Sequence, residues 1–400
     1  MSKDKLNLPP DFFKNFTKEE FNNFFNTLFK EGVQQMLQGE LEGHLGYSKY
    51  KKEDKQTTNS RNGTSKKTLK TSRGDLPIEV PRDREASFEP KLVRKHKRMG
   101  EEIEDAILSF YAKGMSTTDI EDQIEEIYGV SVSSGTVSNV TNRILESVKS
   151  WQSRPLEPVY FMVWMDGITF KVRHEGRVIN KTIYLMIGLN NQGFKEVLGM
   201  WLHETESASF WMSVFTDIKA RGVEDIFIIC SDNLAGLTEG INSIFPQAVA
   251  QICVVHQIRN SLRYVVWKDK KLFMAHLKKV YQAPNRQAAE QALEEFAEKW
   301  GQKYAYAIKS WRNNWDNLTH FFDFPVEIRT VIYTTNVIES FNSTLRKYTR
   351  NRLVFPSDEA VFKAIFMAIE RISKKWTQVV RNWGLILSQF INLYGDRCRI

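Results

Sequence analysis

The stretch VYFMVWMDGITFKVRHEGRVINKTIYLMIGLN, residues 159–190, decides the fold of this chain. Two runs rich in β-branched and aromatic residues lie on either side of the turn HEG, which predicts a pair of antiparallel strands. The first run carries an acid, Asp166, which closes the apolar segment PVYFMVWMD. The same pattern returns later, where Asp232 closes the apolar segment DIFIICSD. Both acids are therefore expected at the ends of strands.

The residues after this hairpin alternate between strand and helix patterns. Strands are predicted at 196–204, 225–232 and 249–255, and helices at 207–222 and 235–245, from the period of their apolar residues. Three antiparallel strands followed by helix, strand, helix and strand is the order of an RNase H-like sheet. The predicted fold class is therefore α/β with a mixed sheet.

A third acid completes the candidate site. Glu339 lies 107 residues beyond Asp232, in the helix-like segment TTNVIESFN. Two acids at strand ends and one on a distant helix can gather hard oxygen ligands for divalent metal ions. The net charge is +8, and these acids in a basic chain favour chemistry on nucleic-acid phosphates. Spacing alone leaves a second reading open. The chain has 48 acids, and Glu339 could be the capping-box acid of a helix that begins at Asn336.

The chain beyond the sheet reads as helix. An all-α insertion is predicted between the second and third acids, because apolar and aromatic residues there recur at helical spacing. On the helix of Glu339, the core face is predicted to carry Ile338, Phe341 and Leu345. The opposite, polar face is predicted to carry Glu339, Asn342, Ser343, Arg346 and Arg350.

The N-terminal third carries the positive charge. Residues 49–98 hold 16 Lys and Arg against 7 Asp and Glu, and their polar, turn-rich sequence predicts a mobile basic arm with one short strand. A solvated linker is the alternative. Three helices at 100–149 resemble a helix-turn-helix, although such units are also common without DNA. The candidate DNA contacts are Arg61, Lys66, Lys67, Lys70 and Arg73, then Thr136, Asn139, Asn142 and Arg143, and on the last helix Arg346, Lys347 and Arg350.

A long amphipathic helix is predicted at 17–46, opened by a capping box of Thr17 and Glu20. Its phenylalanine-rich face, Phe21–Leu37, could be local core or the seam of a dimer. The predicted segments are 1–48 (helical, possible dimerisation), 49–98 (basic, DNA-contacting), 99–150 (helix-turn-helix-like), 151–256 and 331–350 (two parts of an RNase H-like catalytic domain), 257–330 (all-α insertion) and 351–400 (helical C-terminus).

The three cysteines show no CxxC spacing and indicate a reduced, intracellular protein. Neither a signal-like N-terminus nor a long apolar run is present, so we expect a cytoplasmic, nucleoid-associated protein that does not use a membrane. Cys253 and His256 form a C-x2-H pair, which is too few ligands for zinc. Taken alone, His256 is expected to be a buried structural histidine.

Several ordered motifs resemble one known family. They are RNGTSKKTLKTSRGDLPIEVPRDREASFEP, YAKGMSTTDIEDQIEEIYGVSVSSGTVS, WMDGITFKVR, KEVLGMWLHETESASFW, RGVEDIFIICSDNLAGL, FPQAVAQICVVHQIRN and TTNVIESFNSTLRKYTR. In this order and at these separations they are similar to the Mutator-type transposases of bacterial insertion sequences.

The resemblance implies an RNase H-like catalytic domain with a helical insertion before the last acid. Asp166, Asp232 and Glu339 match the family's acidic triad, which implies two Mg²⁺ ions with Mn²⁺ as a substitute. Cys253 and His256 match its C/D-x2-H motif, which implies a catalytic role for His256 and a supporting role for Cys253. Asn233 departs from the glycine of many relatives, which could reshape the loop beside Asp232.

The expected function is that of a DNA transposase. It would bind double-stranded DNA at terminal inverted repeats, nick the element ends by metal-dependent hydrolysis, and join the 3′-OH to target DNA by transesterification through a circular intermediate. Two ends must be held together, so a homodimer or a larger synaptic complex is expected. Two alternatives stay open: a non-catalytic DNA-binding protein, and a plain metal-dependent nuclease.

Overall fold

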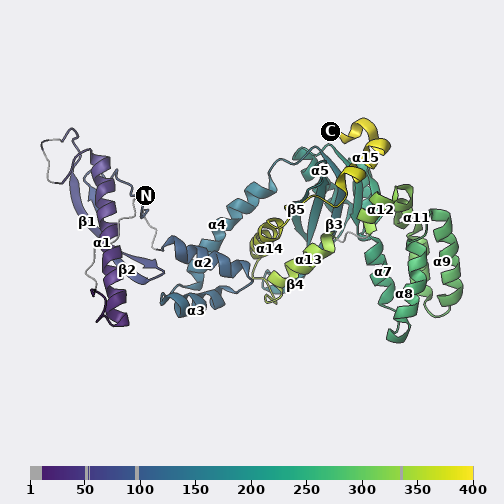
Figure 1. Ribbon diagram of the computed structural model, residues 1–400, viewed down its shortest axis with the longest axis horizontal. Helices are drawn as coiled ribbons and strands as arrows, with labels where there is room; N and C mark the ends of the chain where they lie inside the picture. Colours follow the sequence, from purple (N-terminus) through teal and green to yellow (C-terminus); the bar gives the residue numbers. More distant parts are fainter. Residues whose placement is uncertain (1–10, 50–52, 54, 95–98, 334–336, 400) are drawn as a thin grey trace. The chain divides into compact units, whose positions relative to one another are not determined.

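A computed structural model describes residues 11–49, 53, 55–94, 99–333 and 337–399 of the chain (Figure 1). The chain divides into two compact units, Met1–Thr141 and Asn142–Ile400, and the division falls inside helix α4 (Ser134–Gln152). Among the described residues, no helix combines the length and the apolar character needed to cross a membrane.

The second unit is built around a five-stranded mixed sheet in the order β5-β4-β3-β6-β7. Strands β3, β4 and β5 are antiparallel neighbours, whereas β6 and β7 run parallel to β3. The predicted order of strands and helices is confirmed. The strands are β3 (Val159–His174), β4 (Arg177–Asn190), β5 (Lys195–His203), β6 (Asp225–Ser231) and β7 (Val249–Ile252).

Helices cover both faces of this sheet, which explains why the first half of β3, the second half of β4 and all of β6 are largely apolar and buried. On one face, α5 (Ala208–Ala220) and α6 (Leu237–Ile244) bury a core that includes Trp211 and Phe215. On the other face, Phe390 of α15 (Trp383–Tyr394) packs its ring 5.0 Å from that of Phe161 in β3. The sheet is therefore a rigid platform for side chains at its edges.

Only helices occupy the chain between β7 and residue 333, which confirms the predicted helical content of 257–330. Phe273 of α8 packs against Phe296 and Trp300 of α9, and these two helices lie side by side (Figure 1). The helices are α7 (Val254–Leu262), α8 (Trp267–Tyr281), α9 (Arg286–Trp300), α10 (Ala305–Asn313), α11 (Trp315–Thr319) and α12 (Val326–Tyr333).

The strand predicted at 249–255 is too long, because β7 ends at Ile252 and Cys253 is already the N-cap of α7. After the insertion come α13 (Val337–Thr349) and α14 (Asp358–Ser373). The predicted core face of α13 is confirmed, since Ile338, Phe341 and Leu345 are buried. The proposed N-cap, Asn336, lies outside the described residues.

In the first unit, the prediction of a mobile basic arm is wrong for residues 61–83. β1 (Arg61–Thr71) and β2 (Gly74–Asp83) form an antiparallel hairpin beside α1 (Lys18–Leu45) (Figure 1). Alternate residues of β2 pack with Val33 and Leu37 of α1. The strand β1 escaped prediction because it is almost entirely polar, and only its partner strand carries the alternating apolar residues Leu76, Ile78 and Val80.

Of the remaining predictions for this unit, some are confirmed and one is wrong. The helices α2 (Glu101–Ala112), α3 (Thr117–Tyr128) and α4 confirm the three predicted at 100–149, and the Thr17 capping box is present. The core reading of the phenylalanine-rich face is wrong for most of its members. The buried face of α1 instead carries Val33 and Leu37, which pack on the hairpin, and Leu41 and Leu45, which pack with Tyr47 and Phe88. Phe21, Leu28, Phe29 and Met36 are exposed.

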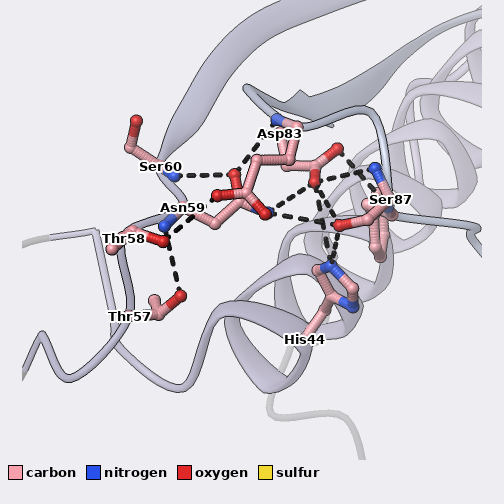
Figure 2. A network of polar contacts seen from close by, with 9 residues as sticks. His44, Thr57, Thr58, Asn59, Ser60, Asp83 and Ser87 are labelled. Atoms are coloured by element: carbon pink, nitrogen blue, oxygen red, sulfur yellow. Dashed lines mark hydrogen bonds and ion pairs between the residues drawn. The ribbon is translucent and has the colours of Figure 1, made fainter.

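A buried carboxylate at the end of β2 joins the hairpin to its flanking loops (Figure 2). Asp83 is 3% exposed and accepts hydrogen bonds from Asn59 Nδ2 (2.6 Å), Ser87 Oγ (2.7 Å) and the backbone N–H groups of Ser87 and Phe88. Burial by itself raises the pKa of a carboxylate. Here the hydrogen bonds outweigh burial and hold the pKa of Asp83 well below its usual range.

We predict that Asp83→Ala lowers the free energy of local unfolding of the β1–β2 hairpin by about 2 kcal/mol, because it removes the charged acceptor that the buried Asn59 side chain, the Ser87 hydroxyl and two backbone N–H groups share. Hydrogen exchange of the β1 and β2 amides in the full chain measures this quantity. Glu85→Ala is the matched control and should change it by less than about 0.5 kcal/mol, since Glu85 is exposed. Equal effects would contradict the role of Asp83. Because its folded pKa is depressed, its contribution is present above about pH 4 and is lost as the pH falls.

Candidate active site

Two aspartates and a cysteine lie where the parallel part of the sheet ends. The last paired residues of β3 and β6 are Met165 and Ser231, and the next residues along the two strands are Asp166 and Asp232. Ser231 also pairs with Ile252 of β7, which is followed by Cys253. Because parallel strands in register end their pairing at one edge, these side chains become neighbours.

Asp166 itself does not end a strand, which corrects the sequence expectation. β3 continues to His174 as the partner of β4, and Asp166 lies opposite Leu185 in that antiparallel ladder. At Asp166, β3 is therefore still paired with β4 on one side, whereas its pairing with β6 on the other side has ended. The backbone of Asp166 is fixed by sheet pairing, while its carboxylate faces the edge that β6 leaves open.

His256, on the first turn of α7, lies among all three predicted acids. Its Nδ1 is 3.0 Å from Asp232 Oδ1, and its Nε2 is 3.3 Å from Glu339 Oε1 and 3.9 Å from Asp166 Oδ2. Donor atoms of Asp166, Asp232 and His256 all lie within 4.8 Å of one another, a spacing that could hold a metal ion. Glu339 reaches the same imidazole from α13. All four predicted catalytic side chains are thus brought together.

Two further side chains hold the acids in place, and sequence reasoning assigned neither to the site. Arg259, one turn after His256 on α7, makes an ion pair with Glu339 Oε2. Asn342, one turn after Glu339 on α13, donates from Nδ2 to Asp166 Oδ2 at 2.6 Å. The spacing of three residues from a candidate catalytic group was the available signal, because it places both side chains on the same helix face.

The placement of Asn342 corrects the prediction of an exposed polar stripe on α13. Asn342 is 3% exposed, whereas Ser343, Arg346 and Arg350 of the same predicted stripe are exposed. The helix therefore turns Glu339 and Asn342 inward to the site and leaves its basic residues outside.

The electrostatics of the site are dominated by the burial of negative charge. Burial, assisted by the charge of Asp232, raises the pKa of Asp166, although His256 and hydrogen bonds oppose the shift. Burial also raises the pKa of Glu339 against the pull of Arg259 and His256. Burial acts to lower the pKa of His256, but its contacts with Asp232 and Cys253 dominate and raise it to about 11. Without a metal, the imidazolium supplies the balancing positive charge.

The donor set fits divalent cations that prefer oxygen. Glu339 Oε1 and His256 Nδ1 are buried and lack a hydrogen-bond partner, despite the short distances to their neighbours. A buried carboxylate oxygen without a donor is costly unless a cation or water completes it. Three carboxylates around one small region are the ligands that Mg²⁺ and Mn²⁺ favour.

The loop after Asp232 is tied to the body of the unit. Glu206 accepts hydrogen bonds from Tyr184 Oη at 3.1 Å and from the N–H of Ala235 at 3.3 Å. Asn233 donates to Asn314 in the helical insertion at 3.1 Å. Its side chain thus links this loop directly to the insertion. No pattern in the sequence identified Glu206.

The candidate DNA contacts of the first unit fall into two groups. Lys66 and Arg73 are exposed on the hairpin. Arg61 instead donates to the carbonyl of Tyr47 at 2.8 Å and stacks on its ring. Because its guanidinium is engaged in these contacts, it is a poor candidate for a direct DNA contact. Lys67 and Lys70 donate to the backbone carbonyls of Arg94 and Ser131 and are only partly exposed.

The helix α4 carries the other candidates. Asn139 and Arg143 are exposed, and Thr136 is half-buried beside Ser133. Asn142 is exposed but accepts a hydrogen bond from Lys363 Nζ at 3.0 Å, so its amide is already engaged with α14.

Comparison with known proteins decides the family, since the family model described as "Transposase, Mutator family" matches residues 11–379. The chain belongs to the Mutator family of transposases. It is 40% identical over 377 residues to a transposase for insertion sequence element ISRM3 of Rhizobium meliloti, covering 94% of both chains. A probable transposase of an ISRM3-like element from Sinorhizobium fredii has the same identity and coverage. A transposase for IS905 of Lactococcus lactis is 32% identical over 361 residues, covering 90% of this chain and 92% of that one.

We predict that the metal-free Mutator-family protein keeps the His256 imidazole protonated through neutral pH, since its pKa is raised to about 11. Histidine NMR signals followed against pH measure this pKa, and addition of Mg²⁺ should lower it by charge repulsion. A raised folded pKa stabilises the fold fully below about pH 6.5 and loses that effect as the pH rises toward 11. His276 is the internal control, because burial and two lysines lower its pKa. Titration of His256 near pH 6 without metal would contradict the prediction.

Proposed function

We propose that this chain is a DNA transposase that cuts and joins strands with Asp166, Asp232 and Glu339 at its catalytic centre. The observation that carries the proposal is the convergence of these acids, from β3, the end of β6 and α13, on His256 of α7. The substrate would be double-stranded DNA, namely the terminal inverted repeats of an insertion sequence and a target. The products would be a nicked element end with a free 3′-OH and then a joined strand, formed through a circular intermediate.

We further propose that the second unit is an RNase H-like domain. The strand order β5-β4-β3-β6-β7, with three antiparallel strands followed by two parallel ones, supports this assignment. Its acids lie at the edge where β3 and β6 stop pairing. Such folds place their functional groups at strand ends because the sheet fixes the backbone and leaves the side chains free to meet a ligand.

Asp166, Asp232 and Glu339 would hold two Mg²⁺ ions, with Mn²⁺ as a substitute. When bound, such ions activate a nucleophilic oxygen and stabilise the leaving oxygen of a phosphodiester. Glu339 Oε1 supports this assignment, because it is buried and makes no hydrogen bond, and a bound cation could take the place of the facing His256 imidazolium as its partner.

The other side chains would orient these ligands and move protons. Asn342 holds one oxygen of Asp166 and the N–H of Gly167 holds the other, which fixes the direction of its lone pairs. Arg259 holds Glu339 Oε2 and leaves Oε1 facing His256. His256, between the acids, would release a proton at Nε2 and take it back. Cys253, the N-cap residue of α7, would support His256 through its side-chain contact with the imidazole.

DNA contact in the second unit is proposed for the exposed side of α13. Arg346 and Lys347 lie in the last turns of the helix that carries Glu339, and Arg350 follows them. A cation two turns from a catalytic acid can bind the phosphate backbone close to the bond that is cut. In the first unit, Lys66, Arg73, Asn139 and Arg143 are the exposed candidates. Two element ends require at least two protomers.

We predict that Asp166→Asn, Asp232→Asn and Glu339→Gln each reduce strand transfer by more than about a thousandfold while DNA binding survives. The measurements are joining of a labelled inverted-repeat end in Mg²⁺ and a gel-shift titration. Glu239→Gln is the matched control, because it removes an exposed acid from α6 of the same unit.

Activity retained in any one triad variant would contradict the assignment of that acid. If the triad variants lost DNA binding together with activity, the loss of activity would be explained by binding, and the catalytic role of the acids would be contradicted. Ends that are cut by the natural protein but never joined would identify a nuclease, and the transposase proposal would then fall.

We predict that Arg346→Ala combined with Arg350→Ala weakens DNA binding about equally for all sequences and reduces the slope of affinity against salt by about two. Binding isotherms at several salt concentrations measure this slope. Lys309→Ala, which removes an exposed cation from α10, is the control. An unchanged slope would exclude α13 from the phosphate contacts.

A further inference from the structure

An apolar stripe runs along α1 next to the face that packs on the hairpin, and its members are exposed except for the half-buried Phe25. Its members recur every three or four residues, so they share one face of the helix. Phe21, Leu28 and Met36 are 41%, 47% and 58% exposed, whereas Val33 and Leu37 on the adjoining face of the helix are buried. The stripe consists of Phe21, Phe25, Leu28, Gly32, Met36, Gly39 and Gly43.

No other part of the protomer packs against the glycines of the stripe. A Cβ atom built on Gly32, Gly39 or Gly43 would meet nothing within 4 Å. None of the three needs glycine for its backbone, since none has a positive φ. Glycine is a poor helix former, and three of them in one helix weaken it unless their small size is used. Because glycine has no side chain, a partner surface that docks on this stripe could approach the backbone of α1 closely.

The order of the stripe is symmetric about Gly32. Four residues to either side lie Leu28 and Met36, and seven residues to either side lie Phe25 and Gly39. Eleven residues to either side lie Phe21 and Gly43. If a second α1 is placed antiparallel with the two-fold axis at Gly32, each phenylalanine faces a glycine. The central pairs are then glycine with glycine and leucine with methionine.

We propose that this α1 stripe binds the α1 stripe of a second copy of the chain, antiparallel and with the two-fold axis at Gly32. A two-fold interface requires one surface to be complementary to itself, and bulky residues facing glycines across the axis meet that requirement. The phenylalanine end is enlarged by Phe13, whose ring lies 5.4 Å from that of Phe21. None of the seven positions carries a charge, so the stripe does not suit phosphate contacts.

This inference names the surface through which the two protomers of the proposed transposase would pair. The proposed function explains why a dimer is needed, but the α1 interface is argued from α1 itself. Its readout is mass in solution without DNA, whereas the catalytic proposal is read from strand joining. Either can fail while the other stands.

The first test is sedimentation equilibrium of the full chain. The natural protein should be a dimer, and Gly32→Leu should raise the dissociation constant by about tenfold to a hundredfold, because a bulky side chain at the axis meets its own copy. The same substitution should not destabilise the protomer, since leucine favours helix and has open space there. Glu31→Leu, an equally exposed change off the stripe, is the matched control and should leave the dimer intact. A monomeric natural protein, or a dimer indifferent to Gly32→Leu, would overturn the proposal.

The second test fixes the direction of pairing by disulfide formation. Gly32→Cys should link two chains, whereas Leu28→Cys and Met36→Cys should each fail alone and link when the two variants are mixed. Cys230 and Cys398 are buried, and the natural chain reports any background from Cys253. Linkage of Leu28→Cys with itself would indicate parallel helices and overturn the two-fold axis at Gly32.

Discussion

The register between β3 and β6 is the constraint on which the catalytic unit depends. Their parallel pairing ends at Met165 and Ser231, so the next residues, Asp166 and Asp232, become neighbours at the sheet edge. A shift of one residue would turn either side chain to the opposite face, because side chains alternate along a strand. Burial of both faces of the sheet fixes the register, since each strand has a large apolar side chain for each layer.

The cost of burying negative charge explains the rest of the site. Asp166 and Glu339 are mostly buried, and like charges within a few ångströms repel strongly in a low-dielectric setting. Positive charge from His256 and Arg259 and a hydrogen bond from Asn342 offset that cost. These groups arrive on α7 and α13, one directly after β7 and the other beyond the helical insertion. The insertion therefore lengthens the chain between ligands without separating them in space.

Much of this arrangement was readable from sequence because the signals were local. The apolar runs ending at Asp166 and Asp232, the helical periods of the insertion, and the capping box at Thr17 each depend on one element. The hairpin β1–β2 was missed because β1 is nearly all polar and takes its place only through pairing with β2 and the packing of β2 on α1. Asn342 was correctly placed on the same face of α13 as Glu339, but its burial was missed, because periodicity separates polar from apolar faces and cannot distinguish solvent from a buried carboxylate.

The sequence by itself determined the family motifs, the order of strands and helices, and the identities of the candidate acids. Only the tertiary structure decided that His256 is their common neighbour, that Arg259 and Asn342 each hold one acid, and that Asp166 lies within a strand rather than at its end. The reason is physical. Periodicity reports the environment of a residue along its own element, whereas a contact between β3, α7 and α13 depends on the register and packing of all three.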